Sequence, residues 1–403
     1  MFSKTFVSAV AALSLATSAV AVSCDDTTAT IASAADATTI ASCDTVEGDL
    51  VILPGAGDTV DISGPTEIKG DLTAQNNGGL ISLTSTTLET IGGAFTLKNV
   101  TLLSTLSFTK LSTVDSINWA SLNALGQLTF GTPGVTKAKS VAIADTFLSS
   151  LDGINIHSLD TMDINNNHRL TDFTTELYNL STLLNINANG QNLNVQMPNL
   201  IWAANLTISN VTTFSAQSLE SVNGSIRFDS NYFTEASFPN LTAVQTGDFS
   251  FINNAKVTNI TAPLLKSVGG GFTIANNTAI EELNGFPLLE MVGGAVLLRG
   301  DFSEVALPAL DDVRGAFDAS STGDITDSCE VFDKLGPKSG GQIQGEYSCT
   351  SKNANANNDT DSTGGTSSGS SNSSSSAVVG APGMSMSWIV SLVSIAGFVV
   401  AFL

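Results

Sequence analysis

A repeat of about two dozen residues runs through the middle of the chain and restricts its fold more than any other feature. Its shared text is L-x-x-V-x-G-x-φ-x-φ-x-x-N, where φ is an apolar residue. A period of about 20 to 29 residues is typical of leucine-rich repeats and β-solenoids, whose coils bury their apolar faces only by stacking on one another. The repeat leucines, separated by 19, 22, 24, 24 and 21 residues, are Leu200, Leu219, Leu241, Leu265, Leu289 and Leu310.

The apolar alternation inside the repeat predicts a short strand in each coil. Residues two apart point to the same face of a strand, as in the pairs Ile226/Phe228 and Phe272/Ile274. We therefore predict an all-β fold, a parallel β-solenoid of roughly twelve coils between Cys43 and Ser320. The glycine of each copy is interpreted as a turn residue that needs a permissive backbone. These glycines are Gly93, Gly224, Gly247, Gly270, Gly294 and Gly315.

Asparagine recurs with the same period. Asn210, Asn231, Asn254 and Asn277 are separated by 21, 23 and 23 residues. Stacked asparagine side chains at a solenoid corner can bond backbone groups that the turn leaves unpaired, although ordinary turn asparagines would give the same pattern. Asn210 also begins a glycosylation sequon, and an inward-facing ladder residue cannot carry a glycan.

The four cysteines lie in two close pairs, one near each end of the repeat region. Four cysteines allow three pairings. We predict the bridges Cys24–Cys43 and Cys329–Cys349, because a long repeat array keeps its two ends apart. Each would close a loop of about 20 residues, worth roughly 3 kcal/mol in the chain-entropy model. A zinc site is not expected at this spacing, and no cofactor is predicted.

The amino-terminal residues are predicted to be a signal peptide. One positive charge, Lys4, precedes a short apolar run that ends in Ala-Val-Ala, and cleavage is expected before Val22. An N-terminal membrane anchor is the alternative. A signal peptide implies an oxidising route, in which disulfides form.

The carboxy-terminal residues have the order of a GPI-attachment signal, in which small residues, a spacer and a terminal apolar tail follow one another. The tail begins at Trp388, and attachment is expected at Asn372 or Ser374. A single membrane span is the alternative reading of the tail. The expected organisation is a signal peptide at 1–21, a solenoid ectodomain at 22–349, a disordered Ser/Thr/Gly/Asn-rich stalk at 350–376 and a removed propeptide at 377–403.

Charge and sugar define the expected surface. The net charge is −22 and charged residues are only 13% of the chain. This balance argues against binding nucleic acid or an acidic membrane surface, because phosphate contacts need Lys and Arg. Ten sequons in a secreted chain imply that several carry glycans. They begin at Asn99, Asn179, Asn205, Asn210, Asn223, Asn240, Asn259, Asn276, Asn358 and Asn372.

Taken together, the targeting signals, the coils at 198–316 and the paired cysteines resemble the fungal GPI-anchored cell-wall organisation proteins, whose repeats are similar to receptor L-domains. The coils between 110 and 200 match only loosely. The resemblance implies a non-catalytic surface glycoprotein needed for wall integrity and morphogenesis, held at the plasma membrane by a GPI lipid or transferred to the wall. Its expected partners are wall polysaccharides or wall proteins. The family offers no catalytic residues to carry over.

A polysaccharide-remodelling enzyme on a β-helix is the alternative function. Such an enzyme needs at least two carboxylates at a defined separation, and three in one groove would favour it. Neighbouring carboxylates such as Glu281 and Glu282 should point to opposite faces of a strand, so they are weak evidence. His157 and His168 lack a nucleophile motif and are interpreted as structural. Trp119 and Trp202 are candidates for stacking on sugar rings, with core packing as the alternative.

Overall fold

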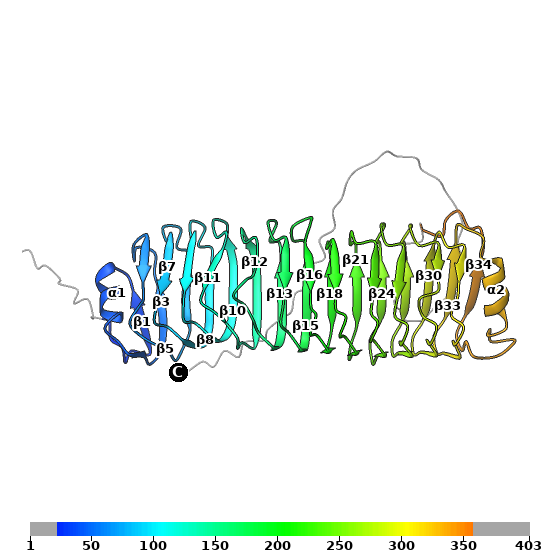
Figure 1. Ribbon diagram of the computed structural model, residues 1–403, viewed down its shortest axis with the longest axis horizontal. Helices are drawn as coiled ribbons and strands as arrows, with labels where there is room; N and C mark the ends of the chain where they lie inside the picture. Colours follow the sequence, from blue (N-terminus) through cyan, green and yellow to red (C-terminus); the bar gives the residue numbers. More distant parts are fainter. Residues whose placement is uncertain (1–21, 358–403) are drawn as a thin grey trace, which may run out of the picture. The chain divides into compact units, whose positions relative to one another are not determined.

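The computed structural model describes Val22–Asn357, and this segment is the subject of the structural results. The signal peptide at 1–21, the sequon residues Asn358 and Asn372, the attachment candidate Ser374 and the propeptide at 377–403 lie outside the described residues. Between Val22 and Asn357 the chain forms a parallel β-solenoid of about 13 turns, whose coils follow one another in chain order (Figure 1). The predicted all-β solenoid is confirmed.

One parallel sheet runs through all the coils. In regular coils a two-residue strand and a longer strand both join it, so most coils contribute two strands rather than the single strand expected. The 23 strands of this sheet within the described residues are β1 (Thr28–Ile31), β2 (Thr45–Val46), β3 (Asp49–Ile52), β5 (Glu67–Ile68), β6 (Leu72–Gln75), β8 (Thr90–Lys98), β10 (Thr113–Leu122), β12 (Ser140–Thr146), β13 (Ser158–Asn165), β15 (Asn179–Asn187), β17 (Trp202–Ala203), β18 (Leu206–Ser209), β20 (Ser221–Val222), β21 (Ile226–Asp229), β23 (Ala243–Val244), β24 (Phe249–Ile252), β26 (Ser267–Val268), β27 (Phe272–Ala275), β29 (Met291–Val292), β30 (Val296–Gly300), β32 (Asp312–Val313), β33 (Phe317–Ser321) and β34 (Tyr347–Thr350).

Short parallel sheets close the other side of the coils. Four strands form the first: β4 (Thr59–Asp61), β7 (Ser82–Ser85), β9 (Thr105–Phe108) and β11 (Leu128–Phe130). Three form the next: β14 (Asp172–Thr174), β16 (Asn194–Gln196) and β19 (Thr213–Ser215). Two pairs complete the side: β22 (Glu235–Ser237) with β25 (Asn259–Thr261), and β28 (Glu282–Leu283) with β31 (Glu304–Val305).

The core lies between these two sides. Every repeat leucine is at most 5% exposed, as the sequence predicts. The apolar pairs of successive strands stack directly, and the rings of Phe228 and Phe251 lie 4.6 Å apart, while those of Phe249 and Phe272 lie 5.5 Å apart. Each coil therefore buries its strand against its neighbours, which is how a solenoid replaces a globular core.

The repeat glycines have a different physical reason from the one predicted. Their backbones are not in the left-handed region, so no turn requires them. Instead they lie against one another in successive coils, where Gly294 N–H donates to the Gly270 carbonyl at 2.8 Å. A Cβ added to Gly294 would lie 2.7 Å from the carbonyl carbon of Gly270, and one added to Gly315 would lie 2.6 Å from that of Gly294. The chain does bend at Gly224, Gly247, Gly270, Gly294 and Gly315, as predicted, but the need for a permissive backbone was the wrong reason for glycine. Close approach of two backbones excludes a side chain here.

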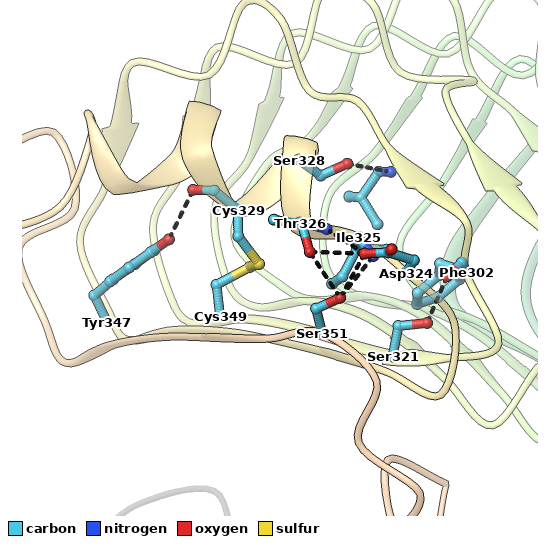
Figure 2. The surroundings of a disulfide bond; sticks show 11 residues. Phe302, Ser321, Asp324, Ile325, Thr326, Ser328, Cys329, Tyr347, Cys349 and Ser351 are labelled. Carbon is cyan, nitrogen blue, oxygen red and sulfur yellow. Dashed lines mark hydrogen bonds between the residues drawn. A yellow bond between two sulfur atoms is a disulfide. The ribbon is translucent and has the colours of Figure 1, made fainter.

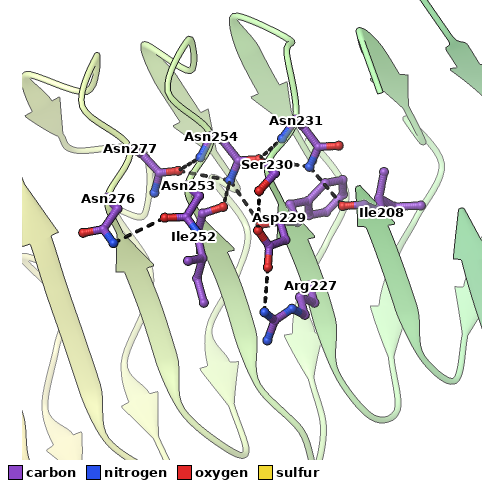
Figure 3. Close-up of polar contacts among 11 residues, drawn as sticks. Ile208, Arg227, Asp229, Ser230, Asn231, Ile252, Asn253, Asn254, Asn276 and Asn277 are labelled. Atoms are coloured by element: carbon purple, nitrogen blue, oxygen red, sulfur yellow. Dashed lines mark hydrogen bonds and ion pairs between the residues drawn. The ribbon is translucent and has the colours of Figure 1, made fainter. Parts of the chain in front are cut away.

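The asparagine ladder is present and longer than predicted. Besides Asn231, Asn254 and Asn277 (Figure 3), the buried Asn167 and Asn189 form the same contact in earlier coils, where the side-chain oxygen of Asn189 accepts from the backbone N–H of Asn167 at 3.0 Å. The side-chain oxygen of Asn254 accepts from the backbone N–H of Asn231, and that of Asn277 accepts from Asn254, at 2.9 and 2.8 Å. Asn210 is not a member. It has φ 62°, is only partly buried and stands one residue before Val211, whose N–H donates to Asn231. The assignment of Asn210 to the ladder was wrong, and its position stays compatible with a glycan.

Two short helices close the ends, and the disulfides hold them. The helix α1 (Ala34–Ile40) lies between Cys24 and Cys43, which are bonded. The helix α2 (Thr326–Asp333) contains Cys329, and its bond to Cys349 ties the helix to the last strand (Figure 2). The predicted disulfide-capped ends are therefore present, whereas the helices were not predicted.

Candidate functional site

None of the eight sequon asparagines in the described residues is buried. Five are exposed and three are half-buried, so the fold presents all eight to the side or corners of the coils. Between Asn99 and Asn179 no sequon occurs. Which sequons carry sugar stays a prediction. The exposed five are Asn99, Asn179, Asn223, Asn240 and Asn259, and the half-buried three are Asn205, Asn210 and Asn276.

A hollow of about 750 Å³ is lined mostly by residues of this sequon-free interval, together with Ile91 and Gly92 of the coil before it, and we call it the side groove. The groove lies where the repeat breaks. The pairing of β10 with β8 shifts register after Val114. In the next coil a single bridge, between Thr113 and Lys137, takes the place of the short strand that regular coils contribute to the sheet. The text of that coil, PGVTKAKS, lacks the L-x-x-V-x-G motif that supplies a short strand elsewhere. The residues central to its lining are Ile91, Val114, Asp115, Lys137, Ala138, Lys139 and His157.

The charged groups of the side groove balance one another. Lys139 Nζ lies 2.6 Å from the Asp115 carboxylate. This hydrogen bond raises the pKa of Lys139, and the charges of Asp115 and Asp160 add to it. Lys137 is exposed and has no ion pair among the residues that the structure describes. The groove thus offers two ammonium donors and a carboxylate acceptor above the apolar side chains of its floor.

Aromatic side chains continue from the groove along the following coils. The His157 imidazole at the groove's edge packs 5.4 Å from the ring of Tyr178, which is 44% exposed. On the next coil the half-buried Trp202 pairs with Asn179, the residue after Tyr178. We call His157, Tyr178 and Trp202 the aromatic strip. The structure thus brings together two residues that were interpreted as structural or core and one tyrosine that sequence reasoning missed.

The other aromatic candidate belongs to the core. Trp119 is 1% exposed and packs edge-on against Phe95 at 5.5 Å. Its indole N–H is buried and has no hydrogen-bond partner among the described residues, which marks a local imperfection in the irregular coils. Trp119 therefore cannot stack on a sugar at the surface.

A second hollow, of about 910 Å³, lies at the carboxy-terminal cap. Three carboxylates line it, from Asp318, Asp333 and Glu346, together with the ring of Tyr347. Asp318 is engaged by Arg299 at 2.7 Å. Burial raises the pKa of Tyr347, and a hydrogen bond with Asp333 adds to the shift. Two of the three carboxylates therefore already have structural partners.

One pair of neighbouring carboxylates, Glu281 and Glu282, does not follow the prediction that the two point to opposite faces of a strand. Glu281 and Glu282 both line a hollow of about 440 Å³, because only Glu282 belongs to β28 and strand alternation does not apply to Glu281. The inference that they point to opposite faces was wrong. Within Val22–Asn357, no group of three His, Cys, Asp or Glu side chains could hold a metal ion. Neither helix of this segment is long and apolar enough to cross a bilayer.

Sequence comparison relates the chain to fungal surface proteins. Protein ecm33 of Aspergillus fumigatus is 36% identical over 350 residues, which cover 86% of each chain. The chain belongs to the ecm33 family. Another member, a cell surface GPI-anchored protein of Arthroderma benhamiae, is 35% identical over 80% of this chain and 82% of its own. The cell surface GPI-anchored protein ECM33 of Candida albicans is 32% identical over 81% and 78%.

The resemblance inferred from the coils and the two ends is thereby confirmed. None of these ecm33-family names describes an enzyme. No protein-family model matches the chain. A solved leucine-rich repeat protein of Bacteroides ovatus covers 69% of this chain and 87% of its own at 9% identity, and its TM-score of 0.30 is too low to support an argument.

Proposed function

We propose that this ecm33-family member is a non-catalytic, GPI-anchored glycoprotein of the fungal cell surface. It supports wall organisation, integrity and morphogenesis through contacts with glycans or wall proteins. The observation that carries the proposal is the 36% identity over 86% of both chains to Protein ecm33, together with relatives named as cell surface GPI-anchored proteins. The rigid array of coils and its exposed sequons suit a presenting surface rather than a moving catalyst.

The proposed domain organisation follows from the same family. Residues 1–21 act as the signal peptide, and 377–403 are removed when the lipid is attached at Asn372 or Ser374. The ectodomain begins at 22 and extends beyond the predicted end at 349, because Thr350 belongs to β34, Lys352 pairs with Asp324 at 2.8 Å and Ala356 is buried. The start of the stalk, expected at 350, therefore moves to after Asn357, and its end stays at 376. The tether is tested by replacing Val390 and Val399 with Arg, which should abolish attachment, since charged residues oppose a hydrophobic tail signal. We expect phosphatidylinositol-specific phospholipase to release the wild-type protein from cells. Continued cell association of the double variant, with no release of the wild type, would contradict the lipid tether.

A polysaccharide-cleaving activity is the second candidate, favoured by the three carboxylates of the carboxy-terminal hollow. Glycoside hydrolysis needs a carboxylic acid and a second carboxylate on either side of the bond. Purified protein is incubated with β-glucan and chitin oligomers, and the products are separated. Products that disappear in Asp333→Asn and Glu346→Gln variants would establish this activity and reject the non-catalytic proposal.

A further inference from the structure

The side groove and the aromatic strip lie on one continuous path along the coils. Register connects them in two adjacent rows. His157, Tyr178 and the exposed Ile201 follow one another from coil to coil, and Trp202 lies in the neighbouring row after Ser158 and Asn179. Successive parallel strands are about 4.8 Å apart. The row of His157, Tyr178 and Ile201 therefore presents one side chain per strand spacing, with Trp202 beside its end, which suits a linear ligand with a short chemical repeat.

The path has the chemistry that sugar rings need. A sugar ring has apolar C–H faces and a rim of hydroxyl groups, and each hydroxyl both donates and accepts. The floor of the side groove supplies Val114 and Ala138, while Lys137 and Asp115 supply a donor and an acceptor. Tyr178 and His157 add flat ring faces, and a largely apolar hollow with a few polar groups is the usual form of a binding site.

The charge balance selects the class of sugar. Lys139 is paired with Asp115 and also experiences the charge of Asp160. Together with the exposed Lys137, these groups carry two positive and two negative formal charges, so the groove has no net charge to attract an anion. The whole chain carries −22, which repels a polyanion at long range. A neutral polysaccharide is not repelled in this way.

We propose that the side groove and the aromatic strip bind a neutral wall polysaccharide laid along the stack of coils. This rests on the proposed wall function and names the ligand class and the surface that contacts it. The position of Asn179 agrees with a role in access, since its side-chain oxygen accepts from Ser158 at the groove's edge. A glycan on Asn179 would stand between the groove and Trp202.

The test measures binding of the full chain, extracted from membranes in detergent and with its N-glycans trimmed, to particles of β-1,3-glucan, chitin and mannan. Tyr178→Ala removes an exposed ring of the strip, and Lys137→Ala removes an unpaired groove donor. Their matched controls are Tyr232→Ala and Lys256→Ala. Both residues are exposed at the opposite corner of the sheet, where the Lys256 Nζ lies 5.6 Å from the centre of the Tyr232 ring. Circular dichroism confirms that all four variants are folded.

We expect saturable binding to at least one of the three neutral polymers, weakened about tenfold by Tyr178→Ala and by Lys137→Ala, which corresponds to a stacking or hydrogen-bond contribution of ordinary size. The two control variants should bind like wild type. Binding that the strip variants do not change, or binding to dextran sulfate in place of neutral polymers, would overturn the proposal. Absence of binding to all three polymers would overturn it too. The phospholipase experiment remains independent, so the surface function and the ligand proposal can fail separately.

Discussion

Two stretches of the solenoid differ in how strictly they repeat. In the regular coils, at 198–316, the repeat glycines touch from coil to coil, and Asn231, Asn254 and Asn277 form an unbroken ladder. In the irregular coils, between 110 and 197, such contacts occur singly, as between Gly134 and Gly153 and between Asn167 and Asn189. There the sheet register shifts beside Val114, and the buried N–H of Trp119 has no hydrogen-bond partner among the described residues. The side groove of about 750 Å³ opens at these irregular coils, whereas the hollow beside Glu281 and Glu282 in the regular coils measures about 440 Å³. Loss of the repeat therefore coincides with the most promising binding surface.

This difference indicates that the repeat consensus and the binding surface depend on different physical requirements. The consensus satisfies backbone groups and close packing, which any coil needs. The side groove arises where one coil lacks the short strand and exposes Lys137 and His157 instead. Stacking accounts for the consensus residues of the regular coils, whereas it does not require the side chains that face the side groove.

The largest predicted effect concerns the glycine contacts. In Gly294→Ala the added Cβ would meet the backbone of Gly270 at 2.7 Å, and neither coil can yield without breaking its neighbours. We expect a loss of about 3 kcal/mol in the free energy of unfolding, measured by urea denaturation. Gly126→Ala in the irregular coils is the matched control, since no atom lies within 4 Å of its added Cβ, and it should change stability by less than about 0.5 kcal/mol. Equal effects at the two sites would show that contact with the neighbouring coil is not the reason for the cost at Gly294.

The asparagine ladder should give a smaller but clear effect. Asn254→Val keeps the volume yet leaves the N–H of Asn231 buried without its acceptor and removes a hydrogen bond to the carbonyl of Phe228. We expect a cost of about 2 kcal/mol by urea denaturation. Asn253→Gly, on the exposed left-handed position beside it, should stay within about 0.5 kcal/mol, because glycine adopts φ 59° freely. If Asn254→Val left the free energy of unfolding unchanged, the ladder would stabilise the protein through packing rather than through hydrogen bonds.

These contacts also show what the sequence could and could not predict. The period, the burial of Leu241 and the same-face pairing of Phe249 with Phe251 follow from spacing alone, and all are found. Spacing could not separate Asn210 from the ladder, because the residue that turns the corner and the residue that bonds inward are adjacent and both are often asparagine. The reason for the glycines was hidden for a similar cause, since contact between coils is not local in sequence.

The ends and the groove escaped prediction for other reasons. The helices α1 and α2 have seven and eight residues, too few to show a helical period. The side groove depends on what a coil lacks, and a missing motif does not name the side chains that will face the gap. Only the cross-coil register brings Lys137, His157 and Tyr178 onto one path.

Acid should loosen the caps while sparing both kinds of coil. Hydrogen bonds and an ion pair with Lys352, joined by Thr326 and Ser351, hold the pKa of Asp324 well below 3.8. A carboxylate with a lowered folded pKa stabilises the protein above its unfolded pKa, and this stabilisation fades as pH falls below 3.8. We expect faster hydrogen exchange in α2 at pH 3 than at pH 5.5, after correction for intrinsic rates. Asp324→Asn should abolish that difference in α2, and a persistent difference would assign it to another group.

The smallest effect is predicted for the ion pair of the side groove. Lys139 and Asp115 have side chains 73% and 38% exposed, so solvent screens their ion pair at 2.6 Å and it contributes little to stability. The pair Arg299–Asp318 in the regular coils is 17% and 31% exposed, and truncating its arginine should cost about 2 kcal/mol, since a more buried partner is left uncompensated. Urea denaturation of Lys139→Ala and Arg299→Ala measures both. A cost for Lys139→Ala as large as that for Arg299→Ala would mean that Lys139 and Asp115 stabilise the irregular coils. The proposal that these charged groups are available to bind a ligand would then lose its support.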